Sequence, residues 1–215
     1  MCYDAVIFDN DGVLTKPTLL EVQREAVRRA FAEFDVEPTT ETVDGVINGG
    51  LTRLRRICSV HDVPVDEFWS RHETHAAATQ RTCLEDGTKP LYDDVTALDD
   101  IDHPLAVVSN NQHATIEHIL DVFDIGDRFE VAYGRDPTVE GARVKKPDPH
   151  YIERAMGELG VDSALYVGDS NVDVVAADRA GIDSAFIRRP HRDGYQLAAE
   201  PTYELDSLDE LLAVC

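Results

Sequence analysis

Two aspartates stand one residue apart near the start of the chain, directly after an apolar run. In VIFDNDGVLT, residues 6–15, Asp9 and Asp11 fall at the end of what we expect to be a buried strand. Neighbouring carboxylates repel each other, and burial removes the water that would otherwise stabilise them. A pair in this position therefore predicts a nearby cation and a site that does chemistry.

Other polar side chains follow later apolar runs of the chain. They lie at or just beyond the ends of further expected strands: Ser109, Asn110, Lys145, Lys146, Asp169 and Asp173. Ligands of open α/β sheets bind at the carboxyl ends of the strands, so we expect these side chains at one rim. A hard divalent cation, Mg²⁺ in first place, would offset the carboxylates. That cation, a lysine and the N–H groups of the turns would suit a phosphoryl group.

The apolar pattern predicts the elements that position these side chains. Strand-like runs are expected at 3–9, 104–110, 129–134, 164–169, 184–189 and 202–205. Several are apolar throughout, as strands covered on both faces are. Helical patterns lie between or after them, at 113–123, 149–160, 172–181 and 207–214. The alternation predicts an α/β fold with a doubly wound parallel sheet.

One segment departs from this alternation, because it shows helical patterns and no strand pattern. The expected helices are 19–34, 39–49, 51–61 and 65–83, and Thr18 with Glu21 has the spacing of a capping box for the first. The sequence therefore predicts an all-helical domain at 16–87, inserted after the first strand. The remaining residues, 1–15 and 88–215, are expected to form the α/β core.

Composition argues against several classes of protein. The 215 residues carry a net charge of −22, which disfavours binding to nucleic acid through its phosphates. Few of the basic residues are lysine, and an acid-rich, lysine-poor surface is typical of proteins from a high-salt cytoplasm. The four cysteines form no CxxC pair, so neither a disulfide framework nor a zinc site is indicated. We find no membrane-spanning run and no signal-peptide pattern, and we expect a cytoplasmic location.

Four short motifs, FDNDGVLT, VVSNN, KKPDP and YVGDSNVD, occur in this order along the chain. Together they resemble the four motifs of the haloacid dehalogenase (HAD) superfamily, and the resemblance covers almost the whole chain. The helical insertion lies where the phosphoglycolate phosphatase-like and β-phosphoglucomutase-like branch carries its small helical cap. The resemblance implies a Rossmann-like core and a Mg²⁺-dependent phosphatase acting on a small phosphorylated metabolite. A phosphosugar mutase is the alternative.

The resemblance also implies a role for each matching core residue. Asp9 matches the nucleophile that becomes an aspartyl phosphate, and Asp11 matches the acid and base that serves the leaving group and water. Ser109 matches the hydroxyl that holds the phosphoryl oxygens, with the backbone of Asn110 as helper. Lys146 matches the lysine that neutralises Asp9 and the phosphoryl group, and Lys145 is the competing candidate.

The metal ligands implied by the resemblance are Asp9, the backbone carbonyl of Asp11, Asp169 and Asp173. Asp173 is expected to act through a metal-bound water or by orienting the lysine. Gly50 and Arg53 lie where the cap of this family carries its substrate-specificity loop. An arginine on a helix is more often a solvated charge, so both interpretations of Arg53 stay open.

Two other functions fit the motifs less well. The dehalogenase branch lacks the second aspartate of the first motif, so Asp11 argues against that activity. A catalytically silent binding protein is at odds with the fact that every motif position is filled. Asn10, which stands where an apolar residue is common, has no assigned role.

Overall fold

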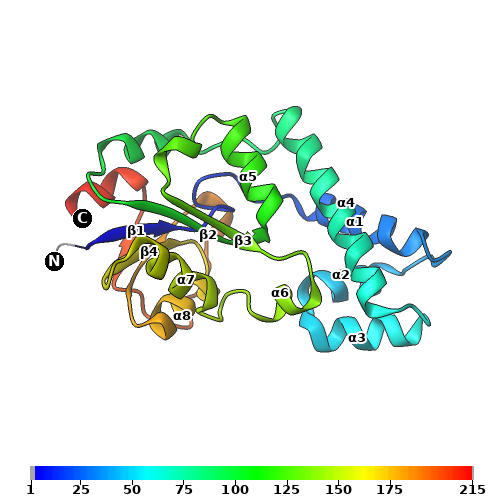
Figure 1. Ribbon diagram of the computed structural model, residues 1–215. Coiled ribbons are helices and arrows are strands. Elements are labelled where there is room, and N and C mark those ends of the chain that lie inside the picture. The colour runs from blue at the N-terminus through cyan, green and yellow to red at the C-terminus, as the bar shows by residue number, and fades with distance from the viewer. Residues whose placement is uncertain (1–2, 215) are drawn as a thin grey trace. The chain divides into compact units, whose positions relative to one another are not determined.

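The computed structural model describes residues 3–214, and its main element is a six-stranded sheet in the order β3-β2-β1-β4-β5-β6 (Figure 1). All neighbouring strands are parallel. The strands are β1 (Ala5–Phe8), β2 (Leu105–Gln112), β3 (Val131–Arg135), β4 (Ala164–Gly168), β5 (Asp183–Ile187) and β6 (Tyr203–Leu205). The predicted α/β fold with a parallel sheet is confirmed.

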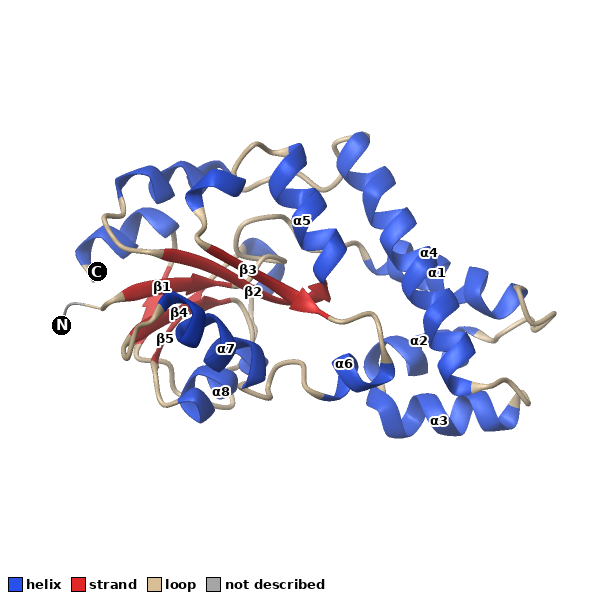
Figure 2. Cartoon of the chain, in the orientation of Figure 1, coloured by secondary structure: helices blue, strands red, loops and turns tan. Residues whose placement is uncertain are grey.

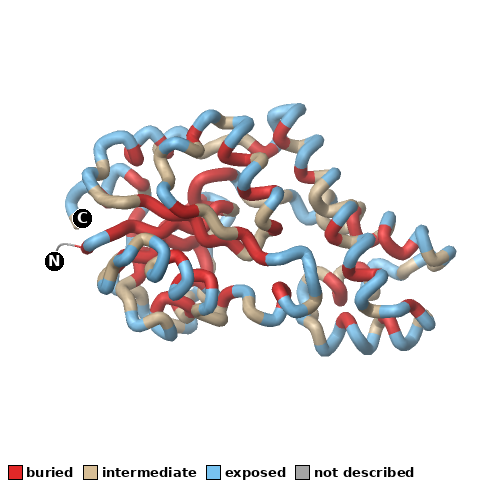
Figure 3. The backbone as a smooth tube through the Cα atoms, in the orientation of Figure 1, coloured by how far each residue is buried: buried red, intermediate tan, exposed pale blue. Residues whose placement is uncertain are grey.

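Helices cover both faces of this sheet. Figure 2 shows α5 (His113–Val122) on one face and α7 (His150–Leu159) with α8 (Asn171–Ala180) on the other. Every residue of β1 and β4 is buried, which explains why both strands are apolar throughout (Figure 3). One core cluster joins Ile7, Val108 and Tyr166 of the sheet to Ile152 of α7 and Ala176 of α8.

The strand order places β1 between β2 and β4, where the direction of winding reverses. In such sheets the connections on either side of the reversal point leave to opposite faces, which opens a crevice at the carboxyl ends of the strands. The side chains that follow β1, β2 and β4 therefore meet at one place, although about 100 residues separate the first two strands in the sequence.

A second compact unit is helical and comprises Thr18–Lys89 together with Asp136–Arg143. Its helices are α1 (Leu20–Ala32), α2 (Thr40–Asn48), α3 (Gly50–Val60), α4 (Val65–Glu85) and α6 (Val139–Arg143). From the sequence we placed 136–143 in the core. In the structure Val139 and Ala142 pack against the hydrophobic cluster of α1, α3 and α4, so this segment belongs with the helices.

The expected capping box of Thr18 and Glu21 is wrong. Helix α1 begins at Leu20, and its preceding residue makes no side-chain cap. The Thr18 hydroxyl instead contacts a buried ammonium, because Lys89 Nζ donates to Thr18 Oγ1 at 2.9 Å and to Gln80 Oε1 at 2.9 Å. A buried charge left without such partners would cost more free energy than one helix cap contributes.

The described residues also hold four 3₁₀ helices: η1 (Asp93–Asp100), η2 (Gly126–Arg128), η3 (Pro190–Arg192) and η4 (Leu208–Ala213). The last replaces the helix expected at 207–214, and the Ser207 side chain caps its start by accepting the N–H of Asp209. Within residues 3–214, none of the helices combines the length and apolar character that crossing a bilayer requires.

Replacement of Asp94 by asparagine should remove a pH-dependent part of the stability. The Asp94 carboxylate binds Arg189 at 2.7 Å and 3.0 Å and accepts the N–H of Leu208 at 2.9 Å, which ties η1 to the end of β5 and to η4. Burial would raise the pKa of Asp94, but the Arg189 and Leu208 hydrogen bonds outweigh it and hold that pKa below its usual value.

A lowered pKa in the folded state stabilises the fold above the unfolded pKa, about 3.9, and this contribution is lost as the pH falls through the folded value. We therefore expect wild type to melt above Asp94→Asn near neutral pH, and the difference to shrink in acid. Thermal unfolding followed by circular dichroism across that range checks this, with the exposed Asp127→Asn as control. A difference that stays constant into acid would contradict the prediction.

Candidate active site

The loop after β1 is closed by one backbone carbonyl. The carbonyl of Asn10 accepts the N–H groups of Val13, Leu14 and Thr15 at 3.2, 2.9 and 3.0 Å. Gly12 has a φ of +85°, and a Cβ there would lie 2.2 Å from Asp169 Oδ2. This position therefore requires glycine for its conformation and for the close approach of the aspartate.

The side chain of Asn10 serves the same loop, which answers the question that its position raised. It is fully buried, and its Nδ2 donates to Thr15 Oγ1 at 3.0 Å and to Asp11 Oδ1 at 3.3 Å. The other Asp11 oxygen, Oδ2, accepts from Asn111 Nδ2 at 3.1 Å. Asp11 is thus held between the loop after β1 and the end of β2, and the sequence analysis did not foresee the contact with Asn111.

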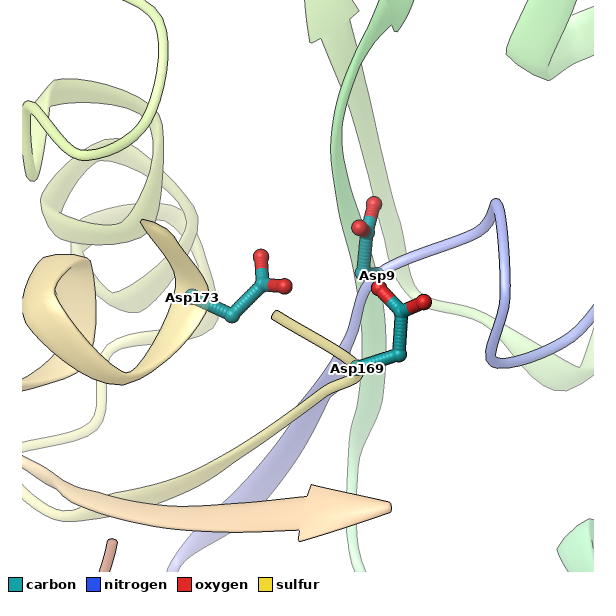
Figure 4. A group of neighbouring side chains, drawn as sticks. All are labelled: Asp9, Asp169 and Asp173. Carbon is teal, nitrogen blue, oxygen red and sulfur yellow. The ribbon is translucent and has the colours of Figure 1, made fainter. Parts of the chain in front are cut away.

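Three buried carboxylates gather at the carboxyl ends of β1 and β4. Figure 4 shows Asp9, Asp169 and Asp173 grouped at one place, with the Asp173 carboxylate directed toward the other two, and ligand oxygens from the three lie within 4.8 Å of each other. Asp9 follows β1, Asp169 follows β4, and Asp173 stands in the first turn of α8. Asp173 Oδ2 also accepts the backbone N–H of Ser170 at 3.1 Å and its hydroxyl at 2.5 Å, so the helix cap orients this carboxylate.

Lys146 is the lysine that reaches these carboxylates. Its Nζ lies 3.1 Å from Asp9 Oδ1 and 2.7 Å from Asp173 Oδ1, and the side chain is only 2% exposed. Asn110 holds the backbone of this residue: Lys146 N–H donates to Asn110 Oδ1 at 2.8 Å, and Asn110 Nδ2 donates to the Lys146 carbonyl at 3.0 Å. Lys145, the competing candidate, is exposed.

Tyr166 is a third partner of the Lys146 ammonium that sequence reasoning missed. Its hydroxyl donates to the carbonyl of Val108 at 2.7 Å and accepts from Lys146 Nζ at 2.5 Å. The hydroxyl proton is directed at the carbonyl, which leaves an oxygen lone pair for the ammonium. A tyrosine in the middle of an otherwise aliphatic buried strand was the available signal.

The electrostatics of the cluster follow from burial. Burial raises the pKa of Asp9 to about 7, the Lys146 ammonium opposes this, and the nearby charges of Asp173 and Asp169 add to it. Burial would lower the pKa of Lys146, but the Asp173 and Asp9 carboxylates outweigh it and hold that pKa well above its usual value. The Lys146 ammonium therefore faces two of the three carboxylates, Asp9 and Asp173, and a further cation would stabilise the cluster.

Asp169 has two basic side chains on η3 as partners, and the sequence analysis missed both of them. His191 Nε2 lies 2.6 Å and Arg192 Nε 2.9 Å from the same oxygen, Asp169 Oδ2. Burial would raise the pKa of Asp169, but the hydrogen bonds from His191 and Arg192 outweigh it and lower that pKa. The available signal was the basic stretch RRPHR, residues 188–192, in a strongly acidic chain.

Ser109 is buried near the end of β2, and its Oγ accepts the N–H of Asn111 at 3.2 Å. Gly50 and Arg53 belong to the helical unit, where Gly50 adopts a φ of +66° at the start of α3. The Arg53 side chain packs against two glycines, since a Cβ at Gly45 would lie 2.7 Å from its Nε and one at Gly49 2.3 Å from its Cδ. Arg53 lines a cavity of about 660 Å³ between α2 and α3.

The chain matches a known family over most of its length. A family model described as haloacid dehalogenase-like hydrolase covers residues 6–187. The chain belongs to the haloacid dehalogenase-like hydrolase family. The four motifs of the sequence lie at the end of β1, within β2, in the segment between β3 and α7, and at the end of β4, and the resemblance seen in the sequence is confirmed.

Relatives within this hydrolase family include named phosphatases. A phosphoglycolate phosphatase from Cereibacter sphaeroides is 30% identical over 200 residues, covering 87% of this chain and 86% of the relative. A phosphoglycolate phosphatase from Colwellia psychrerythraea is 29% identical over 225 residues, covering 97% and 95%. Among solved structures, CbbY from Rhodobacter sphaeroides in complex with phosphate has a TM-score of 0.72 at 22% identity, covering 98% of this chain and 96% of that one.

The residues of this hydrolase's cluster fit a hard divalent cation. Carboxylate oxygens are the ligands such ions prefer, and here three buried carboxylates offer oxygens within 4.8 Å of one another. The three carboxylates also outnumber the two permanently charged side chains beside them, Lys146 and Arg192, which points the same way. Asp9, Asp169 and Asp173 could therefore hold a metal ion.

Proposed function

We propose that this hydrolase is a Mg²⁺-dependent phosphatase that cleaves a small phosphomonoester through an aspartyl phosphate on Asp9. The observation that carries the proposal is the buried Asp9 carboxylate, 3.1 Å from the Lys146 ammonium and clustered with Asp169 and Asp173. A carboxylate can approach an anionic phosphoryl group only where cations offset both charges. Lys146 and a metal at the cluster meet that requirement.

In the first step an Asp9 oxygen attacks phosphorus and the bond to the leaving oxygen breaks. Asp11 gives its proton to that oxygen, so the product leaves as an alcohol and Asp11 becomes a carboxylate. In the second step Asp11 takes a proton from water, which attacks the aspartyl phosphate and releases inorganic phosphate. Contacts from Asn10 and Asn111 support this role, because they hold Asp11 in one orientation beside the nucleophile.

The metal ligands in this proposal are Asp9, the backbone carbonyl of Asp11, Asp169 and Asp173. Bound there, Mg²⁺ would neutralise charge on the phosphoryl oxygens and on the carboxylates. Ser109 is assigned to the phosphoryl oxygens. Asn110 is assigned to hold Lys146, since its side chain pairs with the backbone of that lysine and its carbonyl accepts from Arg135 at 2.9 Å.

The substrate class in this proposal is a compact metabolite such as phosphoglycolate or a sugar phosphate, and the reaction is placed in the cytoplasm. The named phosphoglycolate phosphatases among the relatives support it. The test is a phosphate-release screen over a panel of metabolite phosphates, with and without Mg²⁺, at low and molar KCl. Release that needs added bisphosphate, or isomerised product in place of phosphate, would favour the mutase alternative.

Arg53→Ala should raise KM for the true substrate without changing turnover of a generic aryl phosphate. Arg53 lines the α2–α3 cavity, is half-exposed and has Glu41 at 3.9 Å as a distant partner, so its charge is available to a substrate anion. We expect a rise in KM of about tenfold, the usual cost of one charged contact. Steady-state kinetics on both substrates check this, with the exposed Arg55→Ala on the same helix as control. Equal effects on the two substrates would show that Arg53 does not contact the substrate.

The melting temperature should rise between low and molar KCl. A net charge of −22 makes the folded state repel itself, and salt screens that repulsion. Thermal unfolding at increasing KCl measures the effect, and sorbitol at matched osmolality controls for solute exclusion. A melting temperature that is flat or falls with KCl would contradict adaptation to a high-salt cytoplasm.

A further inference from the structure

The basic stretch at the end of β5 is not used by the proposed reaction. Residues 188–192 carry Arg188, Arg189, His191 and Arg192 in a chain whose net charge is −22. Arg189 forms a salt bridge with Asp94, and Arg188 Nε donates to Glu204 at 2.8 Å. His191 and Arg192 are the basic residues of this stretch that contact the carboxylate cluster, and both are hydrogen-bonded to Asp169.

Both side chains meet one oxygen of Asp169. His191 Nε2 and Arg192 Nε lie 2.6 and 2.9 Å from Asp169 Oδ2. The backbone of Gly12 closes another side of that oxygen, because a Cβ there would lie only 2.2 Å away. Asp169 Oδ2 therefore has two donors and a close backbone neighbour, and a metal ion can reach it only if a donor leaves.

The charge of Arg192 opposes a metal at either oxygen of Asp169. A guanidinium stays protonated throughout the working pH range, so it is a permanent positive charge beside this carboxylate. A divalent ion at Oδ2 has to displace it. An ion at Oδ1 binds in its repulsive field, in a site where Asp169 is only 4% exposed and solvent screens weakly.

The structure also offers the Arg192 side chain another place. Arg192 is 29% exposed and lines a cavity of about 490 Å³ together with Asp193 and Asp206. Two carboxylates on the same cavity wall could receive the guanidinium when a metal takes Asp169.

We propose that Arg192 is an internal cation that competes with the divalent metal for Asp169 and thereby sets the metal affinity of the enzyme. The inference rests on the proposed function, since it takes Asp169 as a metal ligand. In the metal-free protein Arg192 stabilises the carboxylate, and in the loaded protein its charge is what the metal must overcome. Arg192 is thus a residue that determines affinity through its partner, without touching the substrate.

The test is calorimetric titration of Mg²⁺ into wild type, Arg192→Gln, Arg188→Gln and Asp169→Asn, all freed of metal with a chelator. Glutamine keeps a donor and removes the charge. We expect Arg192→Gln to bind Mg²⁺ about tenfold more tightly than wild type. Its metal-free form should melt lower and gain more from Mg²⁺. Arg188→Gln removes the same charge from the same cavity without touching Asp169, and its Kd should stay within about twofold of wild type.

The outcomes separate two claims: that Asp169 is a metal ligand, and that Arg192 competes with the metal for it. If wild type binds Mg²⁺, Asp169→Asn does not, and Arg192→Gln binds no more tightly than wild type, the competition is overturned while the metal site stands. Weaker binding by Arg192→Gln would show that the arginine orients Asp169 for the metal, which also overturns it. If Arg188→Gln gains as much Mg²⁺ affinity as Arg192→Gln, the gain comes from the change in net charge alone, and the competition for Asp169 is overturned. Absence of binding in both wild type and Arg192→Gln would overturn the metal site and the inference together.

Discussion

Asp9→Asn should lose phosphate release by about 10³-fold or more, while the protein keeps its fold. The asparagine amide is a far poorer nucleophile than a carboxylate, yet its oxygen can still accept the N–H of Asn10, a bond of 2.7 Å in wild type. Burial raises the pKa of Asp9 to about 7, so the charged carboxylate is disfavoured in the metal-free fold. We therefore expect metal-free Asp9→Asn to melt no lower than wild type.

The measurement is steady-state phosphate release together with thermal unfolding, and the exposed Asp162→Asn is the matched control. A second readout is independent of rate: acid-quenched wild type should carry one phosphoryl group on the peptide that contains Asp9. Turnover by Asp9→Asn within tenfold of wild type would mean that Asp9 is not the nucleophile. If wild type itself shows no turnover on any substrate of the panel, the alternative of a catalytically silent binding protein is favoured.

Lys146→Met should cost both activity and stability. The ammonium is 2% exposed and contacts Asp9 and Asp173 at 3.1 and 2.7 Å, so its removal leaves buried carboxylates without a cation. Breaking a buried ion pair in this way costs about 3–5 kcal/mol. We expect a loss of free energy of unfolding in that range, and a fall in turnover of about 10³-fold because charge at the phosphoryl group is no longer offset.

Chemical denaturation and phosphate release measure the two effects, and Lys145→Met, which changes the exposed neighbour, should alter neither. Lys146→Met combined with Asp173→Asn should recover part of the lost stability, since one of the uncompensated charges is then gone. If Lys146→Met is as stable as wild type, the ammonium does not hold the cluster together. If Lys145→Met is the inactive variant, the assignment of the two lysines is reversed.

The sequence by itself determined the elements and the chemistry at their ends. Each strand and most helices could be placed, because an apolar run covered on both faces and a helical stripe are properties of adjacent residues. The same local signals put Asp9, Ser109 and Asp169 at strand ends, and parallel pairing then brings such ends to one edge. Helix caps were predicted less well. Thr18 does not cap α1, because its hydroxyl accepts a hydrogen bond from the buried Lys89 ammonium.

Only the tertiary structure decided which side chains meet. The motif resemblance favours Lys146 over Lys145, but only the fold shows the Lys146 ammonium buried against Asp9 and Asp173 while Lys145 is exposed. The contacts of Tyr166, Asn111 and Arg192 join segments that lie between 20 and 100 residues apart. Such contacts depend on the strand order and on side-chain packing, which no local pattern encodes. The paired aspartates thus predicted a charged site, and the fold brings Lys146 and Arg192 to it as cations.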